Sequence, residues 1–197
     1  MIAAPAAPVP PFAARVTHVT RAELGRSWRP GCPVPPSRLR GIRLAYWDFG
    51  GRRHLGTIVV DETAVRDVET VFRSLYRARF PIRSLRPVAA FGGSDTRSMA
   101  ADNTSGFNCR KAVTTGPAGW SEHAYGLAID VNTVENPYRE AGRWLPSAGK
   151  RFADRTRVRR GMAVPGGVLV RAFAAVGWGW GGRWRNPDYQ HFSANGR

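Results

Sequence analysis

The chain has 197 residues, enough for one domain with a buried core, and its 43% hydrophobic and 11% aromatic content excludes a fully disordered protein. Its net charge is +16, and of 30 basic residues only Lys111 and Lys150 are lysine. This charge attracts polyanions such as nucleic acid, acidic lipid or the anionic polymers of a bacterial wall, although an arginine bias is also typical of a GC-rich genome. No zinc-finger spacing or aromatic RNA-binding motif supports specific nucleic-acid binding, and no apolar run approaches the ~20 residues of a membrane span.

The N-terminal segment is rich in proline and alanine, and we predict a flexible tail over residues 1–27. Its start, MIAAPAAPVPPFAARV, lacks a basic region, and prolines interrupt its apolar character, so it does not resemble a signal peptide. Export would require a leader outside this sequence or another route. Residues 28–197 are predicted to form a single domain.

A hairpin and a helix are predicted next. Residues 39–49 alternate in polarity and residues 56–60 (GTIVV) are apolar, so two strands should flank the glycine pair of DFGGRR. Asp61 can cap the following helix, which Pro81 should end. The apolar residues of this helix recur at helical spacing: Val65, Val68, Phe72, Leu75 and Tyr76. Residues 82–91 are predicted as a further strand.

The second half contains a long polar segment between shorter apolar ones. Residues 92–119 are rich in Gly, Ser, Thr and Asn without periodicity, which is typical of a functional loop. We predict short strands at 127–131 and 189–193, an irregular excursion over 135–160 and a helix at 168–176. The order of elements indicates an α+β fold with a small antiparallel sheet and a few helices.

The two cysteines, Cys32 and Cys109, form neither a CxxC pair nor a zinc-finger array. They form either one disulfide or two buried thiols. A bridge would close a loop of about 80 residues, worth roughly 4 kcal/mol in the chain-entropy model, and would require an oxidising compartment. If the protein is exported, we expect this bridge to pin the Pro-rich segment against the loop that precedes the functional site.

Two of the four histidines lie in compact motifs, WSEHAYGLAIDV and NPDYQHF. His123, Asp130 and His191 supply the number and type of ligands that catalytic zinc uses. Gly126 allows the chain to turn between the first two, and Asp188 lies close enough to His191 to act as a general base. Alternatively, all four are ordinary hydrogen-bonding residues, because a lone His or Asp near a short strand is more often structural.

These motifs resemble those of a known family. SEHAYGLAID matches the S-x-H-x-x-G-x-A-x-D motif of the zinc D-alanyl-D-alanine carboxypeptidase family, which also includes D-alanyl-D-alanine dipeptidases and L-alanyl-D-glutamate endolysin peptidases. DYQHF is similar to its second motif, an acidic residue followed three positions later by His. The resemblance covers about residues 87–193 and implies a Hedgehog/DD-peptidase-like fold for a zinc peptidase domain over 28–197. The implied roles are zinc ligands for His123, Asp130 and His191, catalytic base for Asp188 and substrate contact for Ser121.

The family also carries an upstream arginine that stabilises the oxyanion, commonly within Gly-Tyr-Arg-Ser. The nearest equivalent is GGSDTRS, from which the tyrosine is lost, so Arg97 is the first candidate and Arg110 its rival. Either is also explained as one more arginine of a basic chain. In the run GWGWGGRW, Trp178 and Trp180 are expected in the core, although three clustered tryptophans can also line a groove for peptide or sugar.

The sequence therefore predicts a secreted or wall-directed zinc peptidase that cleaves peptidoglycan stem peptides, with anionic wall polymers as further partners. Two alternatives are a non-catalytic, metal-containing cell-wall binding module and a basic nucleic-acid-binding domain. The acidic residue Asp188 favours the enzyme over the binding module. The lack of a nucleic-acid motif disfavours the other alternative.

Overall fold

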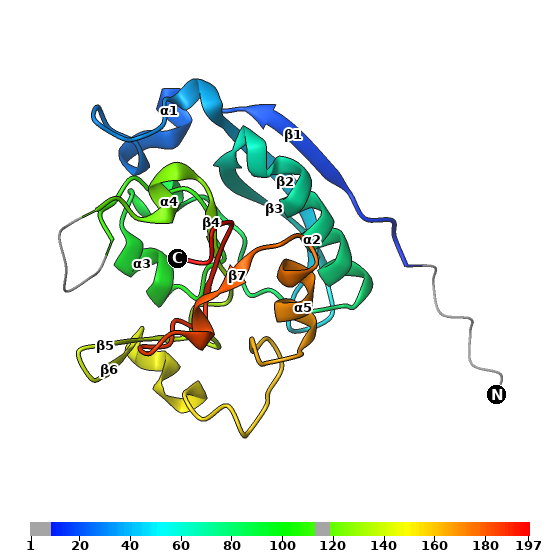
Figure 1. Cartoon of the computed structure of the whole chain (residues 1–197). Coiled ribbons are helices and arrows are strands. Elements are labelled where there is room, and N and C mark those ends of the chain that lie inside the picture. The colour runs from blue at the N-terminus through cyan, green and yellow to red at the C-terminus, as the bar shows by residue number, and fades with distance from the viewer. Residues whose placement is uncertain (1–8, 113–118) are drawn as a thin grey trace.

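The computed structural model describes residues 9–112 and 119–197 of the chain (Figure 1). These residues form two three-stranded antiparallel sheets, in the orders β1-β2-β3 and β4-β8-β7, and a separate hairpin of β5 and β6. Short helices and 3-10 turns connect them. The predicted α+β class, with small antiparallel sheets and a few helices, is confirmed. None of the helices in the described ranges combines the length and apolar character needed to cross a membrane.

The first sheet is built on the predicted hairpin. β2 (Leu39–Trp47) pairs with β3 (Arg53–Asp61) in a register that places Ile42 opposite Ile58, and both of these side chains are buried. The turn between the strands contains Gly51 at φ +75°, a left-handed conformation that glycine adopts without strain. The alternation of residues 39–49 and the apolar run of residues 56–60 therefore located the two strands correctly.

The predicted N-terminal tail differs from the structure. β1 (Ala14–His18) adds to the free edge of β2, and α1 (Arg21–Leu24) follows, with Thr20 and Glu23 forming a capping box. All five side chains of β1 are exposed, so the strand is held by backbone hydrogen bonds and has no apolar alternation. Because this segment lacks an apolar pattern, its sequence is typical of a flexible tail. In the structure, residues 14–27 are nevertheless part of the folded domain.

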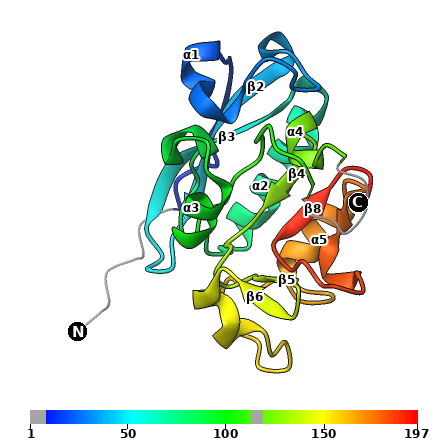
Figure 2. The ribbon, with the colours of Figure 1, turned by 90° about the vertical axis from the view of Figure 1, so that its left-hand side faces the viewer.

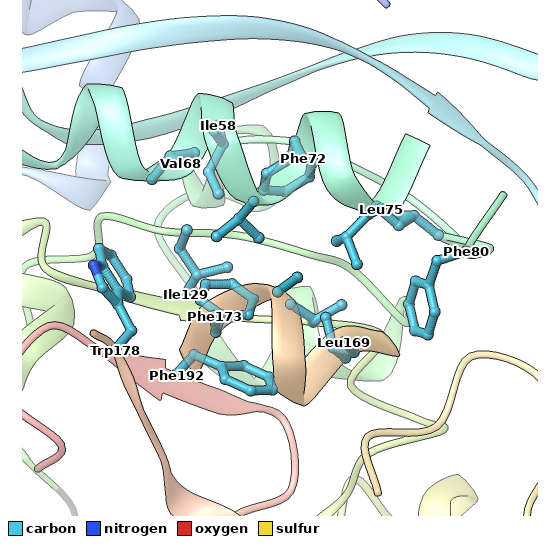
Figure 3. Close-up of a cluster of buried hydrophobic side chains, with 14 of the residues drawn as sticks. Ile58, Val68, Phe72, Leu75, Phe80, Ile129, Leu169, Phe173, Trp178 and Phe192 are labelled. Atoms are coloured by element: carbon cyan, nitrogen blue, oxygen red, sulfur yellow. The ribbon is translucent and has the colours of Figure 1, made fainter. Parts of the chain in front are cut away.

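The core lies between the first sheet and the helix α5 (Val168–Ala174). α2 (Val65–Arg77) packs against both, and Figure 3 shows Val68, Phe72 and Leu75 pointing towards the same cluster as Leu169 and Phe173. Asp61 caps the turn that leads into α2 by accepting a hydrogen bond from the Thr63 backbone. These apolar contacts fix the first sheet relative to the second half of the chain.

The second sheet lies on the other side of this core. β4 (Ala128–Asp130) and β8 (His191–Ser193) run side by side in Figure 2, and β7 (Gly179–Trp180) pairs with the far side of β8. Trp178 and Trp180 are buried, as expected. The sheet is short, and all its residues are buried except Gly179, which is half-buried.

The predicted strand at residues 82–91 is wrong. Leu85 makes only an isolated bridge to Thr104, and Val88–Phe91 form a 3-10 turn that follows Pro87. Pro87 lacks the N–H group that a continuous ladder needs, and Ile82, Leu85 and Val88 are buried without forming a strand. The 3-10 turns of the structure are Gly25–Ser27, Pro36–Arg38, Glu62–Ala64, Val88–Phe91, Ser147–Phe152 and Gly181–Arg183.

The two long irregular segments contain elements that the sequence did not predict. The polar segment holds α3 (Asp95–Ala100), and α4 (Glu122–Tyr125) follows it. The excursion over 135–160 contains β5 (Tyr138–Glu140) and β6 (Arg143–Leu145). A disulfide joins Cys32 to Cys109, with 5.8 Å between their Cα atoms, and so connects the Pro-rich segment to the loop before α4. Of the two alternatives for the cysteines, the structure contains the bridge.

Candidate metal centre and catalytic cleft

Three short elements place the proposed ligands together. Asp130 ends β4 and His191 begins β8, and the antiparallel register sets these two residues directly opposite one another. His123 comes from α4, which ends at Gly126 with φ +71°. A Cβ atom at Gly126 would lie 2.5 Å from the backbone nitrogen of Asp61, so only glycine fits this turn from α4 towards β4.

The ligand atoms of His123, Asp130 and His191 lie within 4.8 Å of one another, and all three residues are buried. His123 Nε2 is 3.2 Å from Asp130 Oδ2, and His191 Nδ1 is 3.3 Å from Asp130 Oδ1. The two imidazole nitrogens, His123 Nε2 and His191 Nδ1, are 3.2 Å apart. This convergence is the geometry expected of a metal centre.

The outer nitrogens of both imidazoles contact backbone carbonyls. His123 Nδ1 is 2.7 Å from the Gly106 oxygen, and His191 Nε2 is 3.0 Å from the Arg197 oxygen. Because a carbonyl oxygen only accepts hydrogen bonds, each outer nitrogen must carry a proton. A neutral imidazole then presents a lone pair at its inner nitrogen, as metal-ligating histidines do.

The inner surface of this trio therefore consists of hydrogen-bond acceptors that require a cation between them. Burial alone would raise the pKa of Asp130, but the two imidazoles hold it well below its ordinary value. Burial alone would lower the pKa of His123, and the Asp130 carboxylate outweighs that effect and raises it. A proton is thus strongly held here, and a divalent metal ion fits the same donor set.

Asp188 lies outside the trio but borders the same cavity as His191. Among the residues that the structure describes, its Oδ1 has no hydrogen-bond partner. Burial raises the pKa of Asp188 to about 7, the charge of His191 opposes the shift and Asp130 adds to it. A carboxyl group with this pKa can both take up and return a proton near neutral pH. The position suits the predicted base, whose role remains a prediction.

The cavity has a volume of about 390 Å³, within the range of ligand pockets. Ser121 lies at its edge and also caps α4, because the backbone N–H of His123 points at its Oγ over 3.3 Å. This predicted substrate contact therefore has a demonstrated structural task beside the cavity.

The structure does not bring Arg97 to the site. α3 begins at Asp95, whose turn is capped by Ser94, and helical spacing directs Asp95 and Met99 into the cavity. Arg97 lies two positions after Asp95, on an exposed face, with its guanidinium near Gly92. Arg97 is therefore not among the residues that line the cavity, and its rival becomes the better candidate.

The rival Arg110 does line the cavity. Burial would lower the pKa of its guanidinium, but Asp95, Asp130 and Asp188 together raise it. Arg110 is therefore a fixed positive charge that faces the carboxylates of the site.

Sequence reasoning missed Tyr138, which borders the cavity, whereas it considered the tryptophan run as a groove lining, and Trp184 of that run does border the cavity. Trp184 lies with its ring centre 5.3 Å from that of His191, whereas Trp178 and Trp180 are buried. The tryptophan run thus contributes Trp178 and Trp180 to the core and Trp184 to the cavity wall. Tyr138 comes from β5 and forms an isolated bridge with Asp188, and no signal in the sequence marked this contact.

Comparison with known proteins supports the same assignment. Residues 114–194 match the family model described as D-alanyl-D-alanine carboxypeptidase, which confirms the resemblance seen in the two motifs. The matched segment contains His123, Asp130, Asp188 and His191, and Arg110 precedes it. No curated protein and no solved structure matched the chain. The chain is thus similar to this peptidase family over the segment that holds the candidate metal centre.

Proposed function

We propose that the protein is a zinc-dependent peptidase that hydrolyses peptide bonds in peptidoglycan stem peptides. The observation that carries this proposal is the convergence of His123, Asp130 and His191 beside the buried carboxyl group of Asp188. All four residues lie in the segment that matches the carboxypeptidase family model.

Zinc is the metal that suits this donor set best, because His123, Asp130 and His191 would supply two imidazole nitrogens and one carboxylate, the ligand types that catalytic zinc uses. When bound, zinc supplies Lewis acidity to a substrate carbonyl and lowers the pKa of a water molecule. His123 and His191 are held in the required tautomers by the carbonyls of Gly106 and Arg197.

The remaining steps belong to side chains of the cavity. Asp188 accepts a proton from the attacking water and returns it to the nitrogen of the leaving amine, so the cleaved bond yields a carboxylic acid and an amine. Arg110 donates hydrogen bonds to the carbonyl oxygen as it becomes negative. Ser121 and Tyr138 border the space in which the peptide would lie.

We further propose that the protein acts outside the cell or in the cell wall. The Cys32–Cys109 disulfide is typical of an oxidising compartment. The net charge of +16 favours residence on anionic wall polymers, and this attraction should weaken as salt rises.

Mass spectrometry of purified muropeptides after incubation with the zinc-loaded protein tests the proposal. Loss of a terminal residue would identify a carboxypeptidase, and an internal cut an endopeptidase. His123→Ala, which removes a ligand, serves as the inactive control. If the zinc-loaded wild type cleaves no stem peptide, the proposal fails and a non-catalytic wall-binding module explains the site better.

A further inference from the structure

The backbone around Arg110 is firmly anchored. The N–H of Asn108 donates to the His123 carbonyl over 3.0 Å, and the N–H of Cys109 donates to the Ser27 carbonyl over 2.9 Å. The Arg110 carbonyl accepts from the Ser121 N–H over 3.1 Å, and the disulfide holds the neighbouring Cys109. These contacts fix the backbone of Arg110, but they do not determine the direction in which its long side chain points.

Asp95 supplies that direction. Its Oδ2 lies 3.0 Å from Arg110 Nε, and its Oδ1 accepts a hydrogen bond of 3.2 Å from the Asn108 side chain. Asp95 is itself fixed, because it opens α3 directly after the cap residue Ser94. The carboxylate is therefore held from two sides and acts as a rigid support for the guanidinium.

The contact is an ion pair formed at a buried atom. Arg110 Nε is shielded from solvent, and the Asp95 carboxylate lies 3.0 Å from it. Asp130 and Asp188 also face Arg110, but the first is a proposed metal ligand and the second exchanges a proton. Asp95 neither binds the metal nor exchanges a proton in this proposal, so its negative charge stays available to pair with Arg110.

We infer that Asp95 is a positioning residue, which aims the Arg110 guanidinium at the carbonyl oxygen that becomes negative during peptide hydrolysis. The inference rests on the proposed function. Asp95 acts only through Arg110, and an interaction that forms in the transition state changes kcat rather than KM. A direct contact between Asp95 and an ammonium group of the substrate would instead change KM.

The test compares kcat and KM of zinc-loaded wild type, Asp95→Asn, Arg110→Ala and the double variant. Asparagine keeps the size of Asp95 and can still accept from Asn108, but it lacks the charge that pairs with arginine. We expect Asp95→Asn to lower kcat about tenfold or more, with KM changed less than about twofold and zinc content unaltered. In the Arg110→Ala background the same change should cost less than about twofold, because the two residues act as a unit.

Two additional variants control for charge and folding. Asp154→Asn removes an exposed carboxylate that also pairs with an arginine, Arg157, and should leave kcat unchanged. Asp95→Glu retains the charge and should recover part of the activity that Asp95→Asn loses. A raised KM with normal kcat, or equal losses with and without Arg110, would overturn the inference.

A readout that needs no turnover separates this inference from the proposed function. Because Arg110 Nε is buried beside Asp95, its proton should exchange slowly with solvent in the wild type and faster in Asp95→Asn, as followed by ¹H–¹⁵N NMR. If the wild type cleaves no stem peptide, the proposed function fails, while slow exchange that depends on Asp95 still establishes the positioning contact. Equal exchange in both proteins would refute the contact itself.

Discussion

Asp130 and His191 face one another across the antiparallel pair of β4 and β8, with His191 Nδ1 3.3 Å from Asp130 Oδ1. Two of the three proposed ligands are thus set by a backbone register and not by flexible loops. The third, His123, reaches them from α4 because Gly126 reverses the chain between α4 and β4. The centre therefore depends on the second sheet and on one glycine.

Zinc content should depend on His123. We expect about one zinc per wild-type molecule and none in His123→Ala after dialysis, because only two of the usual three protein ligands remain. His54→Ala is the matched control, since His54 pairs with Asp48 at the surface, away from the trio. Metal analysis that finds equal zinc in wild type and His123→Ala would remove the ligand assignment.

The turn at Gly126 should be unusually intolerant of a side chain. Gly126→Ala places a Cβ 2.5 Å from the Asp61 nitrogen in addition to the left-handed φ, so we expect a loss of more than about 2 kcal/mol in unfolding free energy. Gly142 has a φ of +79° but nothing within 4 Å of such a Cβ, so Gly142→Ala should cost only about 1 kcal/mol. Denaturant unfolding of both variants measures the difference, and equal losses would argue against the close approach.

The disulfide should contribute to stability by restricting the unfolded chain. The bridge spans a sequence separation of 77 residues, and its loss in Cys32→Ser/Cys109→Ser should lower the unfolding free energy by up to about 4 kcal/mol. Peptide mapping without reductant checks that the bond is present in material from an oxidising compartment. Two free thiols in that material, or unchanged stability of the double variant, would contradict this role.

A buried carboxyl group gives the fold a pH dependence of its own. Burial and the neighbouring Asp102 together raise the pKa of Glu135 to about 7, against the opposing effect of Arg83. Arg155 also contacts this residue through the Glu135 carbonyl. Because the folded protein binds this proton more tightly than the unfolded chain, the contribution of Glu135 to stability falls as pH rises from about 4.5 to about 7.

Glu135→Gln isolates this contribution, because glutamine has nearly the same size and does not titrate. We expect the variant to be more stable than wild type at pH 8 relative to pH 5, as measured by unfolding free energies at both values. If the stabilities of the two proteins change in parallel with pH, Glu135 does not titrate as the structure indicates.

Sequence motifs and apolar periodicity predicted some parts of the fold and of the candidate site, whereas other parts carry no such pattern. The convergence of His123, Asp130 and His191 could be predicted because they lie in two compact motifs, and the core helix α2 could be predicted from its apolar period. β1 was missed because its side chains are all exposed and only its backbone pairs with β2. Residues that become buried in irregular loops show no periodic pattern in the sequence. For this reason the sequence did not single out Arg110 over Arg97 and gave no sign of Tyr138.

The most direct test of the central claim is the rate of stem-peptide hydrolysis by zinc-loaded Asp188→Asn, with zinc content measured on the same sample. Asparagine preserves the shape of Asp188 but does not take up a proton from water. We expect wild-type zinc content and folding, with turnover lower by about 10²-fold or more. A variant with normal zinc and near-normal turnover would contradict the account of this site as a peptidase centre with Asp188 as its base.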